Sequence, residues 1–306
     1  MSAAAGNGST ALVTGVSALV SGATGFLGGR LAVALKNQGY SVRALARPIR
    51  DVTHLAALGI EIVTGDLAEE ESLARAIAGQ QLVFHTAGRV TDWGDAGEFR
   101  EVNVDGTRNL LEAALNEKVG RFIHCSTVGV QGDIKNPPAD EEAPYNPGDY
   151  YQESKVEGEK AALDYFRRRG LPGVVFRPVG IYGPGDTRFL KLFRYAARGK
   201  FPMLGSGEVL YHLTYVDDLV DGILLLGEKK GIEGEVFNLA GERYTTLNEL
   251  VSIIGEVLGV EVSMRRMPVW PVWTAGAVCE FLCRPFRIQP PIYRRRVDFF
   301  VKDRAF

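Results

Sequence analysis

The sequence has few cysteines, almost no net charge and no apolar run long enough to cross a bilayer. Its three cysteines, Cys125, Cys279 and Cys283, are too few and too unevenly spaced for a disulfide framework or a metal-binding knuckle. We therefore expect a reducing compartment, by default the cytoplasm, and no metal site. The formal net charge of −2 over 306 residues leaves no global basic field, so nucleic acid is not an expected partner.

Two segments invite interpretations other than a packed domain. Residues 269–282 are mostly apolar but too few to span a membrane; we expect a helix buried in a small lobe, with weak association with a membrane surface as the alternative. Residues 1–17 are predicted to be an N-terminal extension, because the first ten are small and polar and lack the features of a secretory signal. ALVTG at 11–15 is nearly repeated as ALVSG at 18–22, and only the second copy continues into a full glycine pattern.

This second copy begins a strand, a glycine turn and a helix that together span residues 18–38. Gly22 permits a tight turn out of the strand, Gly25 lets the main chain approach a pyrophosphate, and Gly28 lets the helix pack close to the sheet. The N-terminus of the helix adds free N–H groups and partial positive charge. The pattern predicts a dinucleotide-binding turn, although its G-x-x-G-x-x-G spacing differs from the G-x-G-x-x-G fingerprint.

The strand expected at residues 41–46 ends where the adenosine ribose of a dinucleotide would lie. An acidic residue at this point bonds the ribose 2′-hydroxyl, whereas an arginine accommodates a 2′-phosphate. Arg47 follows the strand directly, and the first acidic residue after it is Asp51. The sequence therefore favours NADP over NAD, unless Arg47 is a solvated loop charge.

Strand and helix patterns alternate along the first part of the chain. Strand patterns recur at 60–67, 81–88, 121–127 and 173–178, and helical patterns lie between them at 70–78, 104–117 and 151–169. This alternation predicts an α/β fold with a Rossmann-like, doubly wound parallel sheet and ligands at the carboxyl ends of its strands. We assign residues 18–180 to an NAD(P)-binding domain, with a further strand near 235–240, and residues 181–306 mainly to a smaller, mixed substrate-binding lobe.

The segment YQESK at 151–155 carries the second functional signal. On a helix, Tyr151 and Lys155 share one face, and a nearby ammonium lowers the pKa of a phenol by favouring the phenolate. Tyr151 would then exchange a proton with an alcohol or ketone near neutral pH. Taken alone, the pair also fits an ordinary surface helix; its place downstream of a dinucleotide turn favours the functional interpretation.

These motifs, in this order, resemble the extended short-chain dehydrogenase/reductases, the NAD-dependent epimerase/dehydratase superfamily. The resemblance covers residues 18–306. It rests on GATGFLGG at 22–29, GDL at 65–67, HTAG at 85–88, NVDGTRNLLEAA at 103–114, CST at 125–127, YQESK at 151–155, RPVGIYGPGD at 177–186 and YVDDL at 215–219.

The resemblance implies a role for each matching residue. Thr127 matches the catalytic Ser/Thr that bonds the substrate oxygen, Tyr151 the general acid/base, and Lys155 the residue that also bonds the nicotinamide ribose. The other implied cofactor contacts are Gly22, Gly25, Phe26, Leu27 and Gly28 at the pyrophosphate, Asp66 and Leu67 at the adenine, Ala87 beneath the cofactor and Pro178 beside the carboxamide. Asn103 matches a helix asparagine near the site, with a structural role as an equal alternative.

The substrate class is indicated by a position at which this chain differs from the nucleotide-sugar epimerases of the superfamily. Its nucleotide-sugar epimerases usually carry an arginine before YVDD, where this chain has Tyr211 and His212. The segment at 268–300 instead resembles the 3β-hydroxysteroid dehydrogenase or dihydroflavonol reductase-like branch, and an apolar pocket would suit a lipidic ketone. We take Ser126, Tyr182 and His212 as candidate substrate residues; His212 fits a packing role equally well.

The sequence thus predicts an enzyme, an NADP- or NAD-dependent oxidoreductase that acts at a secondary alcohol or ketone carbon of a hydrophobic small molecule. One alternative is a nucleotide-sugar 4-epimerase that retains NAD and shows no net redox change. An alternative of another class is a non-catalytic dinucleotide sensor, against which the combination of Thr127, Tyr151 and Lys155 argues. The resemblance also implies a homodimer.

Overall fold

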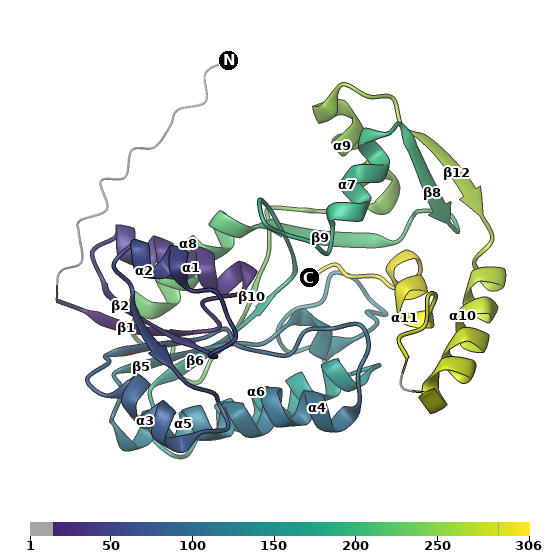
Figure 1. Cartoon of the computed structure of the whole chain (residues 1–306). Coiled ribbons are helices and arrows are strands. Elements are labelled where there is room, and N and C mark those ends of the chain that lie inside the picture. Colours follow the sequence, from purple (N-terminus) through teal and green to yellow (C-terminus); the bar gives the residue numbers. More distant parts are fainter. Residues whose placement is uncertain (1–14, 287) are drawn as a thin grey trace.

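A computed structural model describes residues 15–286 and 288–306, so most of the predicted N-terminal extension lies outside the described residues. Its largest element is a sheet with the strand order β10-β6-β5-β4-β1-β2-β3, in which every neighbouring pair is parallel (Figure 1). The strands are β1 (Ser17–Ser21), β2 (Ser41–Ala46), β3 (Glu61–Thr64), β4 (Leu82–His85), β5 (Arg121–Cys125), β6 (Gly173–Pro178) and β10 (Val236–Leu239). The predicted doubly wound sheet is confirmed.

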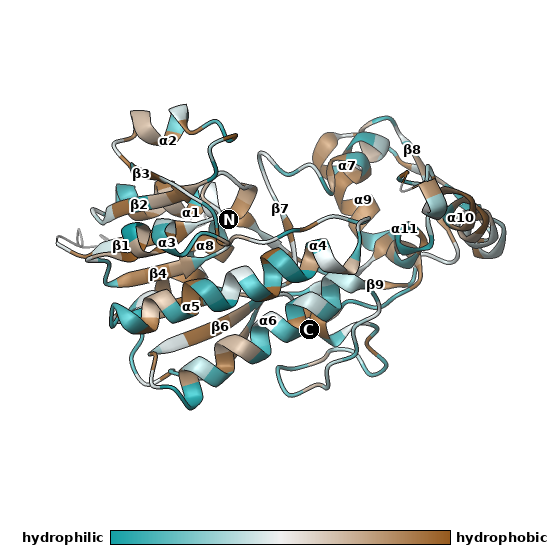
Figure 2. Ribbon diagram, turned by 60° about the horizontal axis from the view of Figure 1, so that its bottom comes forward, coloured by the Kyte–Doolittle hydropathy of each residue, from teal (hydrophilic) through white to brown (hydrophobic). Residues whose placement is uncertain are grey.

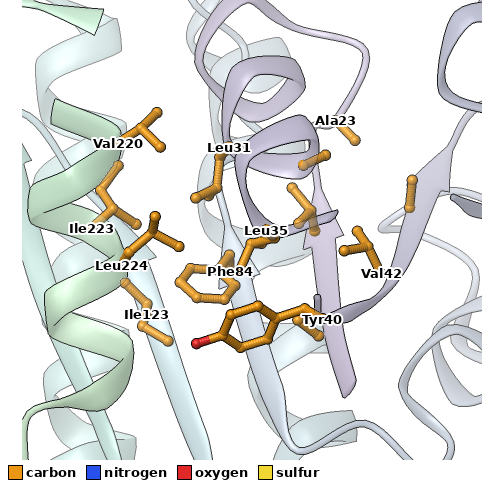
Figure 3. Packing of buried hydrophobic residues seen from close by; sticks show 14 of the residues in the cluster. Ala23, Leu31, Leu35, Tyr40, Val42, Phe84, Ile123, Val220, Ile223 and Leu224 are labelled. Carbon is orange, nitrogen blue, oxygen red and sulfur yellow. The ribbon is translucent and has the colours of Figure 1, made fainter. Parts of the chain in front are cut away.

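One face of the sheet is covered by α1 (Phe26–Asn37), α2 (Thr53–Ala57) and α8 (Val216–Glu228). In Figure 3, Leu31 and Leu35 of α1 meet Ile223 and Leu224 of α8 over Phe84 of β4. The sequence analysis assigned the region of α8 to the substrate lobe. Its apolar stripe instead packs into the core of the parallel sheet, because the chain returns there before it adds β10.

The other face is covered by α3 (Glu70–Ile77), α5 (Gly106–Asn116) and α6 (Tyr150–Arg167). α4 (Ala96–Arg100) and a π-helical turn (Glu101–Asp105) lead into α5. Leu110 and Leu111 of α5 and Ala162 of α6 are fully buried against the sheet. The two faces together fix the carboxyl ends of β1, β4 and β5 side by side, where the predicted site residues lie.

The remaining elements form a smaller lobe beside this edge of the sheet (Figure 1). It contains the sheet β11-β9-β7, the strand pair β12-β8, and the helices α7 and α9. Their bounds are β7 (Gly180–Tyr182), α7 (Leu190–Ala197), β8 (Lys200–Leu204), β9 (Leu210–Tyr215), β11 (Tyr244–Thr246), α9 (Leu247–Leu258) and β12 (Ser263–Met267). A separate apolar cluster holds the lobe together, with Phe201, Met203 and Leu247 at its centre.

The last part of the chain consists of α10 (Val269–Cys283), a short 3-10 turn (Arg284–Phe286), α11 (Arg294–Val297) and a final 3-10 turn (Asp298–Phe300). The expectation of a buried apolar helix at residues 269–282 is wrong: Gly276 is the one buried residue described in α10. In Figure 2 this helix is mostly brown, the colour of hydrophobic residues, and it lies at the end of the molecule away from β1 to β3. Within the described residues, no helix combines the length and apolarity needed to cross a membrane.

Candidate active site

The turn between β1 and α1 lies at the point where the strand order reverses, between β1 and β4. Gly22 has φ +79°, and a Cβ there would lie 2.6 Å from the Ala87 backbone nitrogen, so both conformation and packing require glycine. A Cβ on Gly28 would lie 2.3 Å from the Gly22 carbonyl oxygen. These two glycines let the turn after β1, the segment after β4 and α1 approach one another.

Gly25, in contrast, faces outward at the N-terminus of α1. The nearest atom to a Cβ there would be the Gly22 carbonyl oxygen, at 3.2 Å, and no other neighbour lies within 4 Å. The helix starts without a side-chain cap and without an acidic residue in its first turn. Its free N–H groups and the positive end of its dipole therefore fit a pyrophosphate, and half-buried Phe26 and Leu27 follow directly.

The end of β2 presents positive charge to solvent. Arg47 and Arg50 are exposed, and neither makes a side-chain hydrogen bond or ion pair within the described part of the chain. Arg43, by contrast, donates to the carbonyl oxygens of Arg75, Ala76 and Ala78 at 3.2, 3.0 and 2.9 Å and pairs with Glu61. Arg43 therefore holds the end of α3, and Arg47 and Arg50 stay available.

The predicted adenine residues follow β3. Asp66 is half-buried, and its Oδ1 accepts from the Ala68 backbone N–H at 3.0 Å. Leu67 packs its side chain into the core, while its carbonyl oxygen accepts from Asn109 at 2.9 Å. The main-chain N–H of Leu67 has no hydrogen-bond partner among the described residues and is available to a ligand.

Two further predicted contacts lie on neighbouring strands. Ala87 is half-buried beside Gly22, beyond the end of β4. Pro178 is the last residue of β6 and is buried beside Leu239 of β10. Asn103 has the structural role that was one of its two interpretations: it accepts from the Arg89 N–H at 2.8 Å and donates to Ser154 at 2.9 Å.

The start of α6 meets the end of β5 at Tyr151 and Thr127. Asp149 caps α6 by accepting from the Gln152 N–H at 2.9 Å, which places Tyr151 in the first turn. Tyr151 is 9% exposed, and the Thr127 side chain lies near enough to its hydroxyl to act on the pKa of Tyr151. The hydroxyl of Thr127 accepts from the Gly129 N–H at 3.1 Å. Two of the three predicted catalytic residues therefore lie beside each other.

Lys155 lies one turn further along α6 and is almost fully buried. Its ammonium donates to the Cys125 carbonyl oxygen at 2.6 Å, so it is fixed at the end of β5. Burial lowers the pKa of Lys155, and the nearby Cys125 and Glu159 oppose this effect. The carbonyl of Cys125 thereby positions the third predicted residue.

The predicted lowering of the Tyr151 pKa by Lys155 is wrong, because Lys155 is not among the groups that act on this hydroxyl. Burial raises the pKa of the Tyr151 hydroxyl above its usual value. The positive charges that oppose this rise belong to Arg188 and Arg295, and the hydrogen bond with Thr127 acts in the same direction.

Arg295 is a functional candidate that sequence reasoning missed. Its guanidinium carbon lies 5.4 Å from the centroid of the Tyr151 ring, and its Nε lies 3.2 Å from an Asp149 carboxylate oxygen. It also donates to the Thr91 carbonyl oxygen at 2.8 Å. No local signal in the sequence marks Arg295 as different from its neighbours Arg294 and Arg296.

Two buried histidines lie near Lys155. The Nδ1 atom of His85 on β4 lies 2.7 Å from the Ser21 hydroxyl oxygen, and its Nε2 atom lies 2.9 Å from the Thr107 hydroxyl oxygen. Burial lowers the pKa of His85 to about 3. His124 on β5 is fully buried, burial also lowers its pKa, and neither of its ring nitrogens has a hydrogen-bond partner among the described residues. Both imidazoles are therefore neutral, and Lys155 supplies the positive charge at this edge of the sheet.

Ser126 does not reach the site. Its hydroxyl donates to Glu159, a fully buried carboxylate that also accepts from Arg177 at 2.6 Å and from Tyr145 at 2.8 Å. The alternation of side chains along the strand end explains this placement, because Thr127 and Ser126 point in opposite directions. Ser126 is therefore part of a buried polar network and not a substrate contact.

The other two substrate candidates lie in the small lobe. His212 is 6% exposed, and its ring nitrogens lie 2.9 and 2.8 Å from the carbonyl oxygens of Phe306 and Gly241. His212 therefore has the packing role that was one of its two interpretations. Tyr182 is half-buried and stacks near Tyr215 and Phe193, with ring centroids 5.6 and 6.3 Å away. It remains a substrate candidate.

No cluster of metal-ligating side chains occurs within residues 15–286 and 288–306. Cys125, Cys279 and Cys283 are free thiols and half-buried. Burial raises the pKa of the Cys125 thiol to about 11, so it is protonated at neutral pH.

Comparison with known proteins adds an independent finding. Residues 18–240 match the family described as NAD dependent epimerase/dehydratase family. A ketoreductase from Stigmatella aurantiaca that acts on 4-hydroxy-2-methyl-3-oxo-4-farnesyl-3,4-dihydroquinoline-1-oxide is 31% identical over 269 residues, covering 87% of this chain and 80% of that protein. A 3-beta-hydroxysteroid dehydrogenase from Mycolicibacterium neoaurum is 36% identical over 224 residues, covering 69% and 60%.

The fold is also similar to solved structures. The UDP-glucuronic acid 4-epimerase from Bacillus cereus, in complex with NAD, superimposes with a TM-score of 0.74 at 27% identity, covering 83% of this chain and 86% of that chain.

Proposed function

Because this chain belongs to the NAD-dependent epimerase/dehydratase family, and is thus an enzyme of the oxidoreductase type, we propose that it transfers hydride at a secondary alcohol or ketone carbon of a hydrophobic substrate. One observation carries the proposal. The buried hydroxyl of Tyr151, the neighbouring side chain of Thr127 and the buried ammonium of Lys155 lie together at the carboxyl end of β5, beside the switch point of the sheet.

Each of the three residues has one task. Tyr151 gives its proton to the substrate oxygen in reduction or takes it in oxidation, and Thr127 holds that oxygen in place. Lys155, fixed by the Cys125 carbonyl, would bond the ribose next to the nicotinamide. The nicotinamide, when bound, supplies or accepts the hydride.

The glycine turn fits the pyrophosphate of this cofactor. Gly25 leaves the approach open, Gly22 and Gly28 close the turn behind it, and the uncapped N–H groups of α1 would bind the phosphates. Phe26, Leu27, Asp66, Leu67, Ala87 and Pro178 complete the proposed contacts. The free guanidinium of Arg47 supports NADP over NAD.

The hydrophobic substrate class is supported by two relatives whose names specify a farnesylated quinoline oxide and a 3-beta-hydroxysteroid. A 4-epimerase with retained NAD is the second candidate, which the likeness to the Bacillus cereus enzyme favours. The two differ in stoichiometry, because a reductase consumes NAD(P)H and an epimerase leaves it unchanged. We also infer a cytoplasmic location from the small number of cysteines, and a homodimer from the family resemblance.

The first test compares Tyr151→Phe with Tyr150→Phe, its exposed neighbour on the same helix turn. With hydrophobic ketones and NADPH, Tyr151→Phe should lower kcat by about 10²- to 10⁴-fold while cofactor affinity stays within about twofold. Tyr150→Phe should retain turnover. Equal kcat for the two variants would remove Tyr151 from the acid/base role, and absence of net NADPH consumption with any ketone would favour the epimerase.

The cofactor test uses Arg47→Ala, with dissociation constants for NADPH and NADH measured by fluorescence titration. Loss of a charge-assisted contact to the 2′-phosphate should weaken NADPH binding by about tenfold and leave NADH binding nearly unchanged. The control is Lys118→Ala, which removes an exposed cation from the turn before β5. Arg43→Ala does not serve as a control, because Arg43 holds the end of α3. Equal losses for both cofactors would exclude Arg47 as the 2′-phosphate ligand.

A further inference from the structure

The outward face of α10 is apolar, which reverses the usual pattern of a surface helix. Trp270, Val278 and Phe281 are 72%, 53% and 79% exposed and follow one another at helical spacing. Thr274, the polar residue between them, donates its hydroxyl to the Trp270 carbonyl oxygen and leaves little polarity at the surface. Solvent thus meets a row of large apolar side chains along the length of the helix.

This face continues beyond the helix. We define the α10 patch by its exposed residues: Trp270, Trp273, Val278, Phe281, Leu282, Phe286 and Ile288. The opposite side of α10 packs on the start of α11, where Gly276 lies against Tyr293 and Arg294. Soluble proteins rarely leave so many large apolar side chains together on one surface unless the surface binds something.

Most of the charged residues that flank the α10 patch in the sequence are arginines. Residues 262–297 contain seven arginines and a single acidic residue, Glu280. Glu280 is already paired with Arg294 at 2.7 Å. Arg265 and Arg266 on β12 are exposed and make no side-chain hydrogen bond or ion pair within the described residues. An apolar face next to two exposed arginines, unpaired within the described residues, favours a partner that is apolar and negatively charged.

An anionic lipid bilayer has this combination of properties. Tryptophan and phenylalanine insert at the boundary between headgroups and acyl chains, and arginines bind the phosphates around them. The 15 residues of α10 are about 22 Å long, which is too short to cross the hydrocarbon core and sufficient to lie along its surface. A symmetric contact with a second copy of the chain would instead bring the same arginines face to face.

The geometry points to α10 as a membrane-docking helix: the α10 patch inserts into the surface of an anionic bilayer, with an exposed arginine of β12 at its headgroups. This inference does not depend on the reaction proposed above. It uses only exposure, spacing and charge, and its test requires no turnover.

The test is co-sedimentation of the full chain with vesicles. Vesicles of equal parts phosphatidylcholine and phosphatidylserine should bind the protein, and vesicles of phosphatidylcholine alone should bind it about tenfold less. Raising the salt concentration should release the protein, because screening weakens its attraction to the anionic surface. Absence of binding to the anionic vesicles overturns the proposal.

Variants then locate the contact. Trp270→Ser with Phe281→Ser should weaken vesicle binding at least about tenfold, and Arg265→Gln with Arg266→Gln should weaken only the preference for anionic vesicles. The matched control is Val257→Ser with Leu258→Ser, two exposed apolar residues at the end of α9 that lie outside the patch. Unchanged vesicle binding by the Trp270/Phe281 variant overturns the proposal.

The oligomeric state tests whether a second copy of the chain, instead of a membrane, covers the α10 patch. Light scattering without lipid should give the same mass for the parent protein and the Trp270/Phe281 variant. A change to a smaller species in the variant would show that a second copy of the chain covers the α10 patch, which also overturns the proposal.

Discussion

At Tyr151, burial and positive charge act on the same hydroxyl in opposite directions. Burial raises the pKa, and Arg188, Arg295 and the Thr127 hydrogen bond lower it. Arg295 reaches the ring from α11, while its Nε contacts the Asp149 carboxylate that caps α6. A residue of the C-terminal segment therefore adjusts the proton affinity of the candidate acid/base and holds the start of its helix.

Arg295→Met should raise the pKa of Tyr151 further, because the phenolate loses a nearby positive charge. Ketone reduction needs the protonated phenol and falls above this pKa, so the alkaline limb of its pH profile should move up by roughly one unit. Alcohol oxidation needs the phenolate and should become slower at neutral pH. Arg295→Lys should restore the limb, and Arg294→Met, which removes an arginine paired with Glu280, should not move it.

At the scale of elements, the glycines of the β1–α1 turn have two different tasks: some allow close packing, and one leaves room for a ligand. Gly22 and Gly28 are required by protein packing, since a Cβ on either would overlap backbone atoms. Gly25 is not, because its Cβ would meet one carbonyl oxygen at 3.2 Å. The motif is therefore part scaffold and part binding surface.

Gly25→Ala should weaken cofactor binding at least about tenfold with little loss of stability, because its methyl group occupies the approach of the pyrophosphate. Gly28→Ala should lower the free energy of unfolding by about 1 to 3 kcal/mol, because its methyl group overlaps the Gly22 carbonyl. Gly29→Ala is the matched control for Gly25→Ala, since its Cβ would meet the Ala23 carbonyl oxygen at 3.1 Å. Denaturant unfolding and cofactor titration measure the two effects; equal cofactor affinity in Gly25→Ala and Gly29→Ala would contradict the assignment.

Across the whole molecule, buried neutral histidines make stability depend on pH. Burial holds the pKa of His85 at about 3 and lowers that of His124, whereas both rings take up protons near pH 6.5 when the chain is unfolded. Below that pH the unfolded chain binds more protons than the folded one. The folded state therefore loses stability as the pH falls from about 6.5 toward 3.

Each of the two histidines should contribute a slope of up to roughly 1.4 kcal/mol per pH unit to the free energy of unfolding. His124→Phe should remove one contribution and keep or increase stability at neutral pH, because it also removes two ring nitrogens without partners. Urea unfolding at several pH values measures the slope, with exposed His54→Gln as the control for loss of an imidazole. An unchanged slope in His124→Phe would show that this ring is protonated in the folded state.

Local patterns determined most of the parallel sheet. The strand at 41–46 and the helix at 70–78 occur within a residue of the predicted bounds, and the glycine turn lies at the switch point as expected. These features follow from turn chemistry and hydrophobic periodicity, which act over a few neighbouring residues. The composition of residues 269–282 likewise determined an apolar helix.

The destinations of individual side chains were decided by tertiary structure. Ser126 turns to a buried carboxylate, His212 lies between two carbonyl oxygens, and α8 joins the core of the parallel sheet. The exposure of α10 and the contact between Arg295 and Tyr151 were also decided by tertiary structure, because both depend on how the C-terminal segment packs on elements far away in the chain. Local sequence sets which conformation a segment prefers, and only the packed molecule decides which side chains the segment meets.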